Sequence, residues 1–131
     1  MSRFEYSEKS DHVQVSVEPF YVEKQSKPQE NFYLYGYTVK IKNMGGEAIK
    51  LISRHWIIMN GKGKKTKLDG RGVVGQTPIL KPGETFEYTS ACPLDTPTGN
   101  MRGQYTLSNT HSHVFRAKIP LFFFKPPRTI Q

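Results

Sequence analysis

This chain has a single cysteine, Cys92, and no long apolar run in its 131 residues. One cysteine excludes an internal disulfide and any metal cluster built from several cysteines, and it fits a reducing compartment. No stretch approaches the roughly 18 uninterrupted apolar residues of a membrane-spanning helix. Residues 1–6 carry an acidic residue where a signal peptide requires apolar ones. These absences predict a soluble, cytoplasmic protein.

Helical periodicity is lacking as well, and apolar residues instead alternate with polar ones. Valines occupy every second position in residues 13–17, and tyrosines do so in residues 33–37. The same alternation continues in residues 85–92, 101–107 and 115–123. This pattern is typical of antiparallel strands that place one face on a core. Sequences typical of turns separate these segments, at residues 43–46, 60–63, 81–83, 97–100 and 108–110.

Six or seven strands joined by such turns predict an all-β fold, an antiparallel β-sandwich with two packed sheets. A β-barrel is the alternative closure of the same pattern. The chain is long enough to bury one core, and it shows no internal repeat or linker. We therefore predict a single domain over residues 1–131.

One segment changes its pattern halfway along. Ile49 and Leu51 share one parity, whereas Trp56 and Ile58 share the other. A shift of one residue near residues 53–55 reconciles the two halves and predicts a β-bulge. Trp56 is then expected to anchor the core between the sheets.

Residues 70–75, GRGVVG, fit the pattern G-x-G-x-x-G. In dinucleotide-binding folds this pattern opens a helix whose amides hold pyrophosphate. Pro78 and Pro82 follow too closely for a helix, so we predict a connector between strands. Either its amides form an anion-binding nest, or its glycines only permit positive φ and close packing. The candidate ligand-binding turn is Gly70, Arg71, Gly72 and Gly75, with Arg54 and His55 as a supporting surface.

The formal net charge of +8 is concentrated in one part of the sequence. Residues 40–81 contain two acidic residues, Glu47 and Asp69, whereas the chain before residue 40 is net acidic. Such a block attracts phosphate-rich or acidic partners, or it protects a sheet edge from aggregation. Its basic residues are Lys40, Lys42, Lys50, Arg54, Lys62, Lys64, Lys65, Lys67, Arg71 and Lys81.

Neither a catalytic nor a metal site is predicted. His55 beside Arg54 is the most reactive pair, but no serine, cysteine or carboxylate motif presents a partner for it. His111 and His113 are two residues apart, and two histidines without a third nearby ligand make a weak site. The 11 acidic residues are scattered and form no magnesium cluster. We expect no metal and no cofactor.

The aromatic stretch near the C-terminus leaves two interpretations open. Phe123 continues the inward parity of its strand, so Phe122 and Phe124 are expected on the opposite face. There they form an exposed patch for binding or self-association, or an N-terminal arm with Phe4 and Tyr6 covers them.

An ordered set of motifs resembles the ApaG family over about residues 11–127. They are SRHW at 53–56, GRGVVG at 70–75, PILKPG at 78–83, FEYTS at 86–90, LDT at 94–96 and GNMRGQY at 99–105. The resemblance implies an immunoglobulin-like sandwich of the fibronectin type III kind, with about seven strands. It also implies protein binding without an established catalytic activity, and a family name linked to cobalt and magnesium efflux. The glycine motif of the family has prompted proposals of pyrophosphate or nucleotide binding.

We therefore expect a non-enzymatic module that binds another protein through a face or edge of its sandwich. A phosphate-containing small molecule bound at residues 70–75 is the alternative. Sequence-specific nucleic-acid recognition is not expected, because the tyrosines of residues 33–37 alternate inward and cannot stack bases. The basic charge by itself provides only salt-sensitive, nonspecific affinity. Any link to cation efflux is indirect, since the chain lacks a membrane span.

Overall fold

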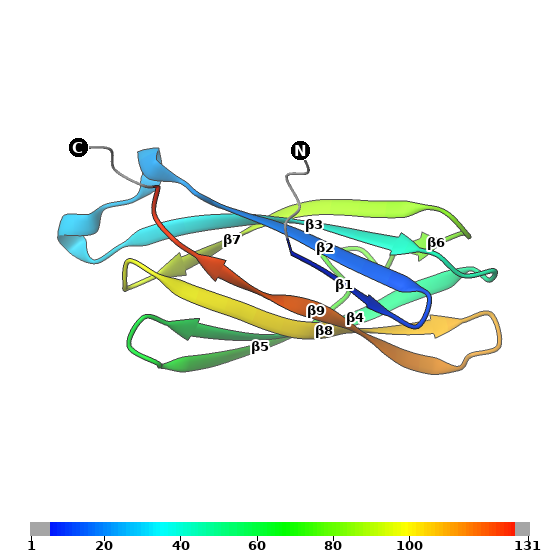
Figure 1. Cartoon of the computed structure of the whole chain (residues 1–131). Helices are drawn as coiled ribbons and strands as arrows, with labels where there is room; N and C mark the ends of the chain where they lie inside the picture. Colours follow the sequence, from blue (N-terminus) through cyan, green and yellow to red (C-terminus); the bar gives the residue numbers. More distant parts are fainter. Residues whose placement is uncertain (1–5, 128–131) are drawn as a thin grey trace.

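The computed structural model describes residues 6–127, which form two antiparallel sheets packed face to face (Figure 1). The first sheet has the order β1-β2-β3-β7 and contains β1 (Tyr6–Ser10), β2 (Val13–Tyr21), β3 (Tyr33–Asn43) and β7 (Thr85–Leu94). The second has the order β5-β4-β8-β9 and contains β4 (Ile49–Asn60), β5 (Lys65–Arg71), β8 (Gly99–Asn109) and β9 (Val114–Phe124). The short β6 (Ile79–Leu80) pairs with β4. Two short 3-10 turns, η1 (Glu23–Gln25) and η2 (Pro28–Glu30), join β2 to β3.

This architecture confirms the predicted all-β sandwich. Nine strands are present in residues 6–127, against the six or seven predicted, and β1, β5 and β6 lie outside the alternating segments. In the same range no helix is long and apolar enough to cross a membrane.

The core forms where the alternating apolar residues of both sheets meet. Trp56 is 2% exposed and packs edge-on against Tyr37 of the opposite sheet, with 5.4 Å between ring centroids. The rings of Tyr105 and Phe122 also pack edge-on against this indole, with 6.4 and 6.0 Å between ring centroids. Trp56 therefore anchors the core between the two sheets, as predicted.

The predicted bulge in β4 is confirmed, slightly earlier in the strand than expected. The pairing of β4 with β8 shifts between Leu51 and Ser53, which leaves Ile52 as the additional residue. Ile49 and Leu51 point inward before the shift, and Trp56 points inward after it. One extra residue thus reverses which side of the sheet each later side chain faces.

A second bulge corrects the prediction for the C-terminal aromatics. Phe122 and Phe124 are fully buried, whereas Phe123 is 41% exposed. The cause is a register shift in which Ile119 pairs with Gly103 and Phe122 pairs with Met101, so that β9 carries an extra residue. This segment contains Pro120, which has no N–H to donate to a ladder and favours such irregular positions.

The buried Phe122 is also covered by the first strand. Tyr6 of β1 lies 6.1 Å from Phe122 between ring centroids, and Ser10 accepts a hydrogen bond from the amide of Lys118 in β9. Phe4, the other residue predicted in this arm, lies outside the described residues. β1 and β9 thus close one side of the sandwich, whereas β5 and β7 form the edges on the other side.

Candidate functional site

The bulge in β4 decides which way each residue of the Arg54–His55–Trp56 triplet faces. Arg54 pairs with Gly70 of β5 and lies on the inner side of the sheet, like Trp56. His55 pairs with Asp69 of β5 and lies on the outer side. The two neighbours proposed as one supporting surface are therefore separated by the thickness of the sheet.

Arg54 is a structural partner of the glycine turn. Its Nη1 donates hydrogen bonds to the carbonyl oxygens of Arg71, at 3.1 Å, and Gly72, at 2.8 Å. Its guanidinium lies so close to Gly70 that a Cβ there would be 2.6 Å from the guanidinium carbon. Gly70 is therefore required for the Arg54 side chain to cross β5 and reach the two carbonyls.

The rest of the glycine motif forms a tight two-residue turn. Val73 and Gln76 exchange two backbone hydrogen bonds of 2.8 Å around Val74 and Gly75, which have φ values of +41° and +78°. Positive φ at both central positions is the geometry of a type I′ turn. The chain then continues into the extended strand β6, as predicted, and no helix begins after this turn.

The turn uses most of its own amides. Gly72 donates to the carbonyl oxygen of Ile52 at 2.7 Å, and Val73 and Gln76 donate to each other. Arg71 pairs with Ser53 on the outer side of the sheet, whereas Arg54 approaches from the inner side. The two arginines of the candidate ligand-binding site thus point to opposite sides of the sheet. The glycines of the motif permit positive φ and close packing, which is the structural alternative given by the sequence.

We expect inorganic pyrophosphate at millimolar concentration to leave the amide signals of Gly72, Val73 and Gln76 in place. These three N–H groups already donate to backbone carbonyls, so a phosphate would have to break a hydrogen bond to reach any of them. A two-dimensional NMR titration at moderate salt measures this directly. Saturable shifts at the three amides would instead restore the phosphate-binding alternative.

His55 has a carboxylate partner that the sequence reading missed. Its Nδ1 contacts Oδ1 of Asp69 directly across the β4–β5 pair. The hairpin turn provides the signal that could have revealed it: Asn60 accepts from Lys64 across the loop, and counting back along both strands pairs His55 with Asp69. The pair is exposed on the outer face, with side-chain exposures of 39% and 72%.

A cluster of tyrosine hydroxyls lies on the inner side, near Arg54. Tyr88 and Tyr105 are hydrogen-bonded to each other in the interior, and Tyr37 lies nearby. Burial raises the pKa of all three hydroxyls above its ordinary value, and the positive charge of Arg54 acts in the opposite direction. Protonated hydroxyls joined in this way serve to link the two sheets.

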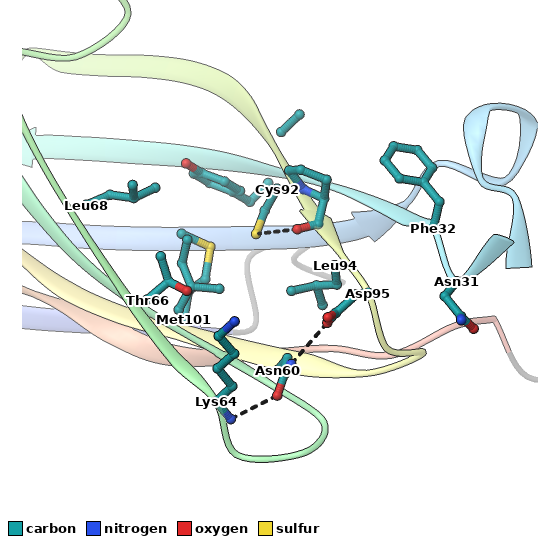
Figure 2. A pocket seen from close by; sticks show the side chains of 14 residues that line it. Asn31, Phe32, Asn60, Lys64, Thr66, Leu68, Cys92, Leu94, Asp95 and Met101 are labelled. Atoms are coloured by element: carbon teal, nitrogen blue, oxygen red, sulfur yellow. Dashed lines mark hydrogen bonds between the residues drawn. The ribbon is translucent and has the colours of Figure 1, made fainter.

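A groove of about 470 Å³ opens between the edge strands β5 and β7 (Figure 2). Leu68 of β5 is 51% exposed here, and Phe32 is 37% exposed at one end. The thiol of Cys92 is buried in the groove wall, and burial raises its pKa to about 11. Other side chains along the groove include Thr66, Leu94, Asp95 and Met101. No sequence motif marked this feature, because it depends on which strands become edges.

His111 and His113 lie in the turn between β8 and β9. His111 contacts Glu47 at 3.0 Å, and Thr110 donates a hydrogen bond to the same carboxylate. The backbone amides of His111 and His113 both donate to Asn109, which organises the turn. Within residues 6–127 no three metal-binding side chains come together.

Residues 23–109 match the family model described as the ApaG domain. Protein ApaG from Bordetella pertussis is 47% identical over 130 residues, covering 99% of each chain. Protein ApaG from Methylorubrum extorquens (strain PA1) is 47% identical over 122 residues, covering 93% of this chain and 94% of the relative. A crystal structure of a protein named ApaA from Bordetella pertussis is 49% identical, with a TM-score of 0.87 over 89% of this chain and 95% of that one. With such similarity along nearly its whole length, in sequence as in fold, this chain belongs to the ApaG family.

Proposed function

We propose that this chain is a non-enzymatic module that binds an extended segment of another protein along the groove between β5 and β7. The observation that carries this proposal is the pair of edge strands beside the groove. In residues 6–127, β5 pairs only with β4, and β7 pairs only with β3. An edge strand offers a row of unpaired N–H and C=O groups, to which an extended peptide adds as a further strand.

The charge of the residues beside the groove indicates which kind of peptide segment would bind there. Lys64 lies at the groove, and Lys62 is exposed in the same turn of the β4–β5 hairpin. One acidic residue, Asp95, lies at the groove and accepts a hydrogen bond from Asn60. An acidic segment with an apolar residue at every second position therefore fits best, since its apolar side chains would cover Leu68.

The chemistry of the reactive side chains supports a non-enzymatic role. The Cys92 thiol is buried, and a pKa of about 11 keeps it protonated at neutral pH. Within residues 6–127 no hydrogen bond joins His55 to a serine, threonine or cysteine that it would activate. A cytoplasmic protein partner would account for any effect on cobalt or magnesium resistance, which would then be indirect.

Selection from a phage-displayed library of short random peptides tests this function. We expect enriched peptides to be acidic, to alternate apolar residues, and to shift the amide signals of β5 and β7 in NMR spectra. Leu68→Asp should weaken their binding at least tenfold, because it places a negative charge on the apolar wall of the groove.

Leu121→Asp is the matched control, because Leu121 is 44% exposed on β9, away from the groove. This variant should bind the selected peptides like the unmodified protein. Equal binding by the Leu68→Asp variant would reject the groove as the site. A concentration-dependent dimer that Leu68→Asp abolishes would assign the groove to a second copy of this chain instead.

A further inference from the structure

The outer surface of the five-stranded sheet gathers basic residues from distant parts of the sequence. Strand register places their side chains on the side opposite the core, alternating with the inward-facing residues of β4, β5, β8 and β9. We call this surface the basic face. Its exposed basic residues are Lys50, Lys65, Lys67, Arg71, Arg102, Arg116 and Lys118.

Few carboxylates offset this charge. Asp69 lies on the same face and is held by His55, and Glu8 lies at the rim near Lys118. Among the described residues, none of the cations on the basic face forms an ion pair with a carboxylate. Their charges therefore remain available to a polyanion.

The outer surface of the other sheet is different. There Lys9, Lys40 and Lys42 occur together with the acidic residues Glu18 and Glu87, and Lys40 pairs with Glu87 at 3.9 Å. The net charge of the chain is thus concentrated on one side of the sandwich. Arg102, Arg116 and Lys118 lie outside the basic block of residues 40–81, so only the folded chain shows this concentration.

We propose that the basic face binds the phosphodiester backbone of a nucleic-acid duplex without reading its sequence. This proposal is independent of the groove between β5 and β7. It rests on the arrangement of cations across neighbouring strands, from Arg71 on β5 to Arg116 on β9. Arginine guanidinium groups donate two hydrogen bonds to one phosphate, and lysines add point charges.

The width of the basic face favours a duplex over an acidic peptide. Three strand spacings separate β5 from β9, about 14 Å at about 4.8 Å each. An extended peptide follows a single line and would reach the cations of one or two strands. A duplex carries one negative charge per about 1.7 Å of its axis and presents phosphates over a broad surface.

The side chains between the cations favour a duplex over a single strand. Single-strand binders present several rings on which successive bases stack. Phe123 is the exposed ring at one end of the basic face, and Lys125 already lies over it at 5.7 Å. His55, near the centre, is held by Asp69. Contacts with phosphates, rather than with bases, are what this surface offers.

Fluorescence anisotropy with a labelled 20-base-pair DNA duplex of arbitrary sequence tests the proposal. We expect a Kd of about 10⁻⁶–10⁻⁴ M near physiological salt, with log K falling by about 4 to 5 per tenfold increase in salt. Arg102→Glu combined with Lys118→Glu should weaken binding at least tenfold and reduce that slope by about 2, because two phosphate contacts are lost.

The matched control combines Lys9→Glu with Lys42→Glu, which changes the net charge equally on the other sheet. It should retain at least half of the affinity, as should Leu68→Asp in the groove. Equal weakening by the control and the Arg102/Lys118 pair would overturn the proposal. So would polyglutamate that competes as well as the duplex per unit charge, or a single strand that binds tenfold more tightly. Circular dichroism checks that every variant is folded.

Discussion

Replacing Trp56 with alanine is expected to lower the free energy of unfolding by about 3–5 kcal/mol. The side chain is 2% exposed and contacts rings from both sheets, so alanine would leave a cavity at their junction. Since domains of this kind are stable by about 5–15 kcal/mol, this single change removes a large fraction of the total. Urea unfolding followed by far-ultraviolet circular dichroism measures the loss.

Trp56→Phe provides the control for this experiment. It keeps a ring between Tyr37 and Phe122 and removes only part of the volume, so its loss should be clearly smaller than that of alanine. Losses below about 1 kcal/mol for Trp56→Ala would contradict its role as the anchor between the sheets.

Phe122→Ala and Phe123→Ala are expected to differ strongly, although they are the same chemical change at adjacent positions. Phe122 is fully buried and packs near Trp56, Tyr37 and Phe124, so its truncation should cost about 3–5 kcal/mol. Phe123 is 41% exposed, and its truncation should cost less than about 1 kcal/mol. Urea unfolding of both variants gives the comparison.

This pair tests the bulge in β9 directly, because the bulge alone decides which phenylalanine faces the core. Without the extra residue, Phe123 would point inward and the two losses would be reversed. A reversed order, or equal losses, would show that the strand runs in a different register.

The two bulges show why sequence alternation predicts one irregularity and misses another. In β4, apolar residues change parity on either side of the bulge, so Ile49 and Trp56 reveal it. In β9 the residues after the bulge are Phe122, Phe123 and Phe124, which are apolar at both parities. A run of apolar residues without alternation does not show which side chains face the core. The orientation of these phenylalanines is determined by the register of β9 against β8.

The candidate site likewise has some features that the sequence predicts and others that it does not. The sequence correctly indicates a turn without a helix at residues 70–75, since proline and glycine act locally. It does not show that Arg54 and Arg71 face opposite sides, because this depends on the position of the bulge before Ser53. The groove and the basic face depend on strand order, which alternation does not determine.

Because Tyr37 packs against Trp56, tryptophan fluorescence can report whether the groove is occupied. Tyr37 lies along the groove and touches Trp56, and Trp56 is the chain's sole tryptophan. An occupant that displaces the phenol ring therefore alters the surroundings of the indole. Its emission would then register occupancy in unlabelled protein, through a contact whose primary role is to join the two sheets.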